Sequence, residues 1–137
     1  MKSINLYIET SSTAFQKKER RCGYVLEYIK GNTPTTREGF RTGKGTYNQE
    51  ILRTLTEALK RMREPCEICI YSRNQFVLCA IRDKMEIWTR EDFKEIKNRE
   101  DWKGLWEVIQ EHEISVEVGK HAYSDWILRE MEEENEK

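Results

Sequence analysis

Two cysteines, Cys66 and Cys69, have the spacing used by zinc sites and redox motifs. A structural zinc site needs four ligands, and no second ligand pair follows at a suitable spacing. The surrounding segment, EPCEICIY, is typical of a β-strand, on which positions three apart point to opposite faces. We therefore interpret the cysteines, which include Cys22 and Cys79, as structural free thiols.

A basic cluster could instead contact phosphates. It consists of Lys17, Lys18, Arg20 and Arg21, and it lies between the first two expected strands. Such a run of charge is usually a solvated loop, although its position near the end of the first strand would suit phosphate contact. The formal net charge is only -1, so any nucleic-acid binding must come from a local patch of this kind.

The composition indicates one folded domain. The chain has 137 residues, of which 37% are hydrophobic, 36% charged and 10% aromatic, and this argues against disorder. The amino-terminal segment MKSINLYIETSS has no long apolar region, and no stretch approaches the roughly 18 apolar residues of a membrane span. We expect a cytoplasmic protein with no membrane contact.

Three β-strands are expected first and a helix follows them. Residues 4–9 alternate between apolar and polar positions, which is a strand pattern. Residues 23–29 are rich in β-formers, and residues 37–42 could form a polar edge strand before Gly43 and Gly45. From Tyr47 the apolar spacing becomes that of an amphipathic helix ending before Pro65.

The second half alternates strands and helices. It is expected to contain strands at residues 67–71 and 114–118, and helices at residues 74–81, 102–110 and from Ser124. This order implies an α/β fold: a mixed five-stranded sheet, with strands 1–3 antiparallel and helices on both faces. We assign residues 1–131 to the domain and residues 132–137 to an acidic, frayed tail.

Four segments in this order resemble the type 1 ribonuclease H family. They read NLYIETS, TYNQEILRTLTEALKR, PCEICIYSRNQFVLCAI and EISVEVGKHAYSDWI, and the resemblance extends over roughly residues 4–131. The resemblance implies a ribonuclease H-like fold and cleavage of the RNA strand of RNA/DNA hybrids. In that family, carboxylates hold two divalent ions, Mg²⁺ or Mn²⁺, which activate water and stabilise the leaving oxygen.

The catalytic positions implied by the resemblance match only in part. The first carboxylate is Glu9 in place of the usual Asp, His121 falls in the mobile loop, and Asp125 is a candidate for the last carboxylate. In the register set by the Glu57-Ala58-Leu59 segment, the helix carboxylate falls on Ile51, and the carboxylate after strand four falls on Arg73.

Two interpretations of this centre stay open. In the first, Arg73 repels metal and neutralises Glu9 and Asp125. In the second, the register slips by one residue and a metal binds Glu9, Glu50 and Asp125, although one helical position turns a side chain by roughly 100°. In the plainest alternative, Glu9 is simply an exposed acid at the end of a strand.

The resemblance also implies a nucleic-acid-binding surface. Thr46 and Asn48 open the first helix, and Asn74 and Gln75 open the second. Spare N–H groups at helix N-termini suit phosphates, but Thr and Asn there can equally be helix caps. The region 82–103, where many relatives carry a basic protrusion, has balanced charges, so weak binding is expected.

Three functions are consistent with these residues. The leading one is a nucleic-acid-binding ribonuclease H-like domain with impaired or lost metal-dependent cleavage. The second is an active Mg²⁺- or Mn²⁺-dependent ribonuclease H with displaced ligands. The third is a protein-interaction domain that reuses the fold, which the low net charge and acidic tail would suit.

Overall fold

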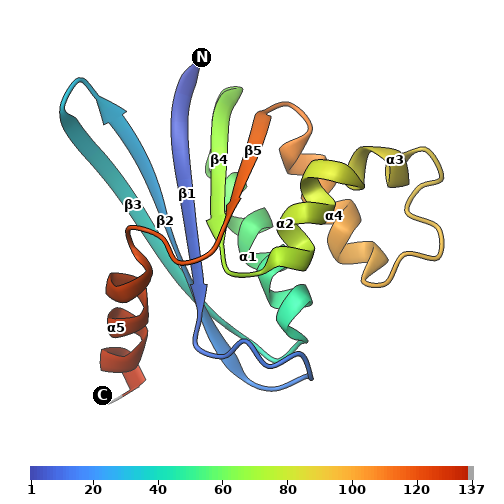
Figure 1. Ribbon diagram of the computed structural model, residues 1–137, viewed down its shortest axis with the longest axis horizontal. Coiled ribbons are helices and arrows are strands. Elements are labelled where there is room, and N and C mark those ends of the chain that lie inside the picture. Colours follow the sequence, from blue (N-terminus) through green and yellow to red (C-terminus); the bar gives the residue numbers. More distant parts are fainter. Residues whose placement is uncertain (136–137) are drawn as a thin grey trace.

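A computed structural model describes residues 1–135 and contains one mixed sheet of five strands in the order β3-β2-β1-β4-β5 (Figure 1). β1 pairs antiparallel with β2, which pairs antiparallel with β3, while β4 and β5 are parallel to β1. The expected fold class is confirmed. The strands are β1 Lys2–Thr10, β2 Arg20–Lys30, β3 Thr33–Gly43, β4 Cys66–Ser72 and β5 Glu113–Val118.

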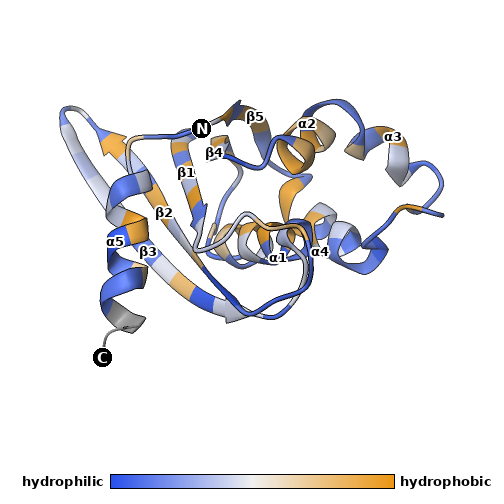
Figure 2. Ribbon diagram, turned by 60° about the horizontal axis from the view of Figure 1, so that its bottom comes forward, coloured by the Kyte–Doolittle hydropathy of each residue, from blue (hydrophilic) through white to orange (hydrophobic). Residues whose placement is uncertain are grey.

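Helices lie on both faces of the sheet. α1, α2 and α4 cover one face, and α5 lies against β1 and β2 on the other (Figures 1 and 2). The helices are α1 Tyr47–Leu59, α2 Gln75–Asp83, α3 Met85–Thr89, α4 Arg99–Ile109 and α5 Ser124–Asn135. The buried side chains of α1, among them Ile51, Leu55 and Leu59, pack in the core with β1 and β4, as the amphipathic sequence of the helix requires.

The two faces of β1 belong to two separate hydrophobic cores. Ile4, Leu6 and Ile8 point into the larger core, which α1, α2 and α4 complete. Tyr7 points the other way, into a small core formed with Val25 of β2 and with α5. This alternation follows from the two-residue period of a strand, and it is the pattern that the sequence predicts.

Most strands are longer than expected, and β3, α3 and the end of α5 differ most from the expectations. β3 pairs with β2 along its full length, starting at Thr33, which faces Lys30. The two strands are joined by a two-residue turn that contains Gly31 with φ of 65°. α3 lies in a segment expected to be merely charged. Residues 132–135, expected to belong to a frayed tail, continue α5 beyond the buried Met131; that they fray stays a prediction. The rest of that tail, residues 136–137, lies outside the described residues.

Within residues 1–135, no helix is both long and apolar enough to cross a bilayer.

Candidate functional site

Glu9 and Arg73 meet at the carboxyl edge of two parallel strands. Glu9 is the penultimate residue of β1, and Arg73 follows the last residue of β4. Since the two strands run parallel and pair in register, their ends lie side by side. Arg73 Nε lies 3.1 Å from both carboxylate oxygens of Glu9, whose side chain is only 4% exposed. The guanidinium therefore partners an almost buried carboxylate.

The segment before α5 completes the surroundings of Glu9. Ser124, fully buried, donates its hydroxyl hydrogen bond to Glu9 Oε2 and accepts one from the backbone N–H of His121. His121 Nε2 lies 2.9 Å from the carbonyl oxygen of Ile8 and 3.3 Å from Glu9 Oε2. Glu9 is thus engaged by a guanidinium, a hydroxyl and an imidazole.

The imidazole of His121 is best described as neutral. Its Nδ1 accepts a hydrogen bond from the N–H of Tyr123, which leaves Nε2 to donate to Ile8. Burial lowers the pKa of His121, although the Ile8 carbonyl and the charge of Glu9 both oppose that shift. The cation beside Glu9 at neutral pH is therefore Arg73, not His121.

Glu50 belongs to a different cluster. Its side chain is fully buried and lies 2.5 Å from Arg41 Nη1 and 2.9 Å from Arg53 Nη1. Glu50 Oε2 also accepts a hydrogen bond of 2.9 Å from the Gly45 N–H. A Cβ atom at Gly43 would collide with the Glu50 carboxylate, which explains the glycine there. Glu50 therefore ties α1 to β3.

The pairing of Glu50 gives a pH-dependent prediction. Burial alone would raise the pKa of Glu50, but the Arg41 and Gly45 hydrogen bonds and the arginine charges outweigh it, and the pKa lies below 4.5. A depressed carboxyl pKa stabilises the folded state above the unfolded pKa, and this contribution is lost as the pH falls. We expect Glu50→Gln to lower the free energy of unfolding by about 1–3 kcal/mol at pH 7, and by progressively less below pH 4.5.

Urea unfolding at pH 7 and at pH 3 would measure this difference. Glu57→Gln is the matched control, because Glu57 also pairs with Arg41, at 3.2 Å, but is 49% exposed. The loss in free energy of unfolding caused by Glu57→Gln should be close to zero at both pH values. If Glu50→Gln lowered the free energy of unfolding equally at pH 7 and pH 3, the pairing of an ionised Glu50 with the arginines would not be its cause.

The remaining predicted catalytic positions, Ile51 and Asp125, have other partners than Glu9. Ile51 is buried in the larger core, and Asp125 is exposed, with its carboxylate 3.2 Å from Lys120 Nζ. Among residues 1–135, no group of three His, Cys, Asp or Glu side chains could hold a metal ion. A divalent ion needs converging oxygen ligands, whereas Glu9 faces a cation, so the residues around it do not fit such an ion.

A family model described as RNase H matches residues 1–123. The chain belongs to the ribonuclease H family. A relative named Ribonuclease H from Sulfurovum sp. is 33% identical over 92% of this chain and 78% of its own length. A Ribonuclease HI from Helicobacter pylori is 41% identical over 50% of this chain and 48% of its own.

Solved ribonuclease H structures share the fold at lower identity. LC9-RNase H1, a type 1 RNase H with the type 2 active-site motif, aligns with a TM-score of 0.81 and 14% identity, over 94% of this chain and 70% of that one. A foamy viral protease–reverse transcriptase in complex with RNA/DNA hybrid aligns with a TM-score of 0.63 and 14% identity, over 85% and 17% of the two chains.

In this ribonuclease H domain, the predicted nucleic-acid contacts at the helix starts also serve as caps. Thr46 forms a capping box with Gln49, and Asn74 Oδ1 accepts the N–H of Val77. Asn74 Nδ2 donates a hydrogen bond of 2.9 Å to Asn48 Oδ1, which ties the two helix N-termini together. Gln75 is exposed beside them. The capping interpretation is confirmed, while nucleic-acid contact stays a prediction.

The basic cluster divides into two parts. Lys17 and Lys18 are exposed on the β1–β2 loop. The expectation of a solvated side chain is wrong for Arg20, which is 1% exposed and donates to the carbonyl oxygens of Ser12, Ala14 and Gln16. Arg20 therefore shapes the loop from within and leaves the lysines on its surface.

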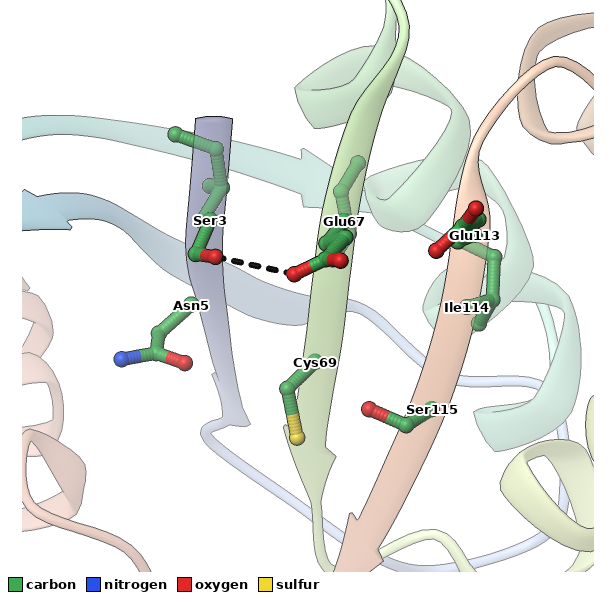
Figure 3. A pocket seen from close by; sticks show the side chains of 9 residues that line it. Ser3, Asn5, Glu67, Cys69, Glu113, Ile114 and Ser115 are labelled. Carbon is green, nitrogen blue, oxygen red and sulfur yellow. Dashed lines mark hydrogen bonds between the residues drawn. The ribbon is translucent and has the colours of Figure 1, made fainter. Parts of the chain in front are cut away.

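The two cysteines of the CxxC pair point to opposite faces, as predicted. Cys66 is buried on the α1 side, and Cys69 lies on the open face of the sheet among Ser3, Asn5 and Ser115 (Figure 3). All four cysteines are free. The face in Figure 3 is a polar hollow, in which Ser3 donates to Glu67.

Sequence reasoning missed Ser124 as a site residue. A serine at the first turn of a predicted helix ordinarily indicates a cap, and nothing in its spacing from Glu9, which is 115 residues away in the chain, predicts their contact. The one usable signal was its position three residues after His121, within the segment that resembles the family's last loop.

Proposed function

We propose that this chain is a nucleic-acid-binding ribonuclease H domain in which metal-dependent cleavage of the RNA strand is impaired or lost. The observation that carries the proposal is the contact between Arg73 and Glu9, 3.1 Å at its shortest. Phosphodiester hydrolysis by two metal ions needs carboxylates that converge on those ions. The guanidinium of Arg73 at the same edge repels a divalent cation and occupies the buried carboxylate of Glu9.

Several features support retained binding of RNA/DNA hybrid or related nucleic acid. The N-termini of α1 and α2 are joined at the edge of the sheet where Glu9 lies, and Gln75, Lys17 and Lys18 are exposed. A structural neighbour of the same fold has been solved with RNA/DNA hybrid. With a net charge of -1 and two exposed lysines on the β1–β2 loop, the affinity should be low, and it should fall as the salt concentration rises.

The second candidate is an active Mg²⁺- or Mn²⁺-dependent ribonuclease H with displaced ligands. The observation that favours it is that the similar relatives bear the name Ribonuclease H. It would require Glu9, Glu50 and Asp125 to converge, although Glu50 is held by two arginines and Asp125 by Lys120.

One pair of assays on the purified chain separates these functions. Fluorescence anisotropy in EDTA should show binding to an RNA/DNA hybrid that weakens as the salt concentration rises. The same hybrid, labelled on the RNA strand, should stay intact after incubation with Mg²⁺ or Mn²⁺. Cleavage that Glu9→Gln abolishes would establish the active enzyme instead. Absence of salt-dependent binding to hybrid, duplex and single strands would reject the proposal and favour a protein-interaction domain.

A further inference from the structure

A groove of about 620 Å³ lies directly beside Arg73. It lies between the β1–β2 loop, the start of α1 and the outer surface of α2 and α3. Four aromatic side chains line it: Phe15, Tyr47, Phe76 and Trp88. Phe15 and Phe76 are 74% and 58% exposed, and exposed apolar surface that gathers at one groove marks a binding site.

Arg73 lines this groove and has donors that remain unused. Its Nε contacts Glu9, while its two terminal nitrogens make no hydrogen bond with any other residue between 1 and 135. The side chain is 39% exposed and also lines a second hollow next to the β1–β2 loop. A guanidinium whose two terminal nitrogens are both free can bind a phosphate in a bidentate manner.

The charges at the rim of the groove also suit a phosphate. Lys84 lines the groove and is exposed. The only carboxylate in the lining, Asp83, lies 2.8 Å from Arg82, so its charge is already paired. The lining of this groove thus combines the exposed rings of Phe15 and Phe76 with the ammonium group of Lys84 and with Arg73, whose charge is shared with Glu9.

We propose that the groove and Arg73 together form a subsite for one unpaired nucleotide, with the phosphate on Arg73 and the base against the aromatic side chains. Rings bind bases through their faces, and within a duplex those faces are covered by the neighbouring base pairs. The occupant is therefore a nucleotide at a single-stranded end or junction. The volume is within the range of small-ligand sites. The inference rests on the proposed nucleic-acid binding and narrows it.

Two hybrids test the inference, one blunt and one with a two-nucleotide overhang carrying 2-aminopurine, whose fluorescence falls when it stacks. We expect the full chain to bind the overhang hybrid about tenfold more tightly than the blunt one, with quenching of 2-aminopurine. Phe76→Ala should abolish both the preference and the quenching, and Arg73→Gln should weaken binding of the overhang hybrid. Ile87→Ala is the matched control, because Ile87 is 53% exposed but lies outside the groove lining.

The outcomes separate this inference from the proposed function. Equal binding of both hybrids, without quenching, would overturn the nucleotide subsite and leave the proposed function intact. Quenching that survives in Phe76→Ala, or is lost equally in Ile87→Ala, would also overturn the subsite. If the chain binds neither hybrid, both the subsite and the proposed function fail.

Discussion

Arg73→Asp is expected to be about 3 kcal/mol less stable than the wild type in EDTA, and to regain part of that loss in Mn²⁺. The substitution removes the partner of Glu9, which is 4% exposed, and places a second carboxylate beside it. Breaking a buried ion pair costs about 3–5 kcal/mol. Solvent around the half-exposed Arg73 reduces that cost, whereas the new repulsion between the two carboxylates adds to it.

The recovery in Mn²⁺ is the decisive part of this prediction. Two facing carboxylates bind a divalent ion only in the folded state, so millimolar Mn²⁺ should raise the melting temperature of the variant by a few degrees. Thermal unfolding followed by circular dichroism would measure it. Arg73→Gln is the control: it loses the same ion pair but gains no ligand, and its melting temperature should not respond to Mn²⁺. An equal response of the wild type would show that its native site already binds metal.

Trp102→Ala is expected to lower the free energy of unfolding by about 3–5 kcal/mol. Trp102 is 1% exposed and packs edge-on against Trp88, with ring centroids 5.2 Å apart. Its removal leaves a cavity between α4 and the rest of the larger core. For a domain of this size, the melting temperature should fall by about 10–20 °C.

Trp126→Ala provides the comparison for Trp102→Ala. Trp126 is the same residue type, but it is 36% exposed on α5 and approaches only the ring of Phe40, at 6.3 Å, among the described aromatic pairs. Its loss should cost about 1 kcal/mol or less. Urea unfolding should be followed by circular dichroism at 222 nm, because each variant removes a tryptophan and therefore changes the fluorescence signal. Similar losses in the two variants would mean that α4 is not anchored through Trp102.

The fold could be predicted because its signals are local and repeated. The alternation in β1 and the apolar spacing of α1 each predict the type of element and the face that it buries. The order of strands and helices along the chain then restricts the possible topologies. α3 could not be predicted in this way. It is only five residues long. The segment after it holds Asp92, Phe93, Glu95 and Asn98 at positive φ, a conformation that usually indicates glycine in a sequence, and none of these residues is a glycine.

The candidate site was predictable where strand order alone brings residues together. Parallel pairing of β1 with β4 is enough to place Arg73 beside Glu9. The position of Glu50 depends instead on Arg41 and Arg53, whose side chains reach it from β3 and from the next turn of α1. Such contacts depend on rotamers, which a pattern of residue types does not specify.

The small core under α5 has a consequence for how this molecule opens. It joins Tyr7 and Val25 to Ile127 and Met131, and it is separate from the larger core. A native protein with two unequal cores opens in cooperative units of unequal free energy, and the smaller unit exchanges its amide hydrogens first. Ser124, whose hydroxyl donates a hydrogen bond to Glu9, is the first residue of α5. We therefore expect Glu9 to become accessible to solvent through detachment of α5 while the sheet and the other helices stay folded.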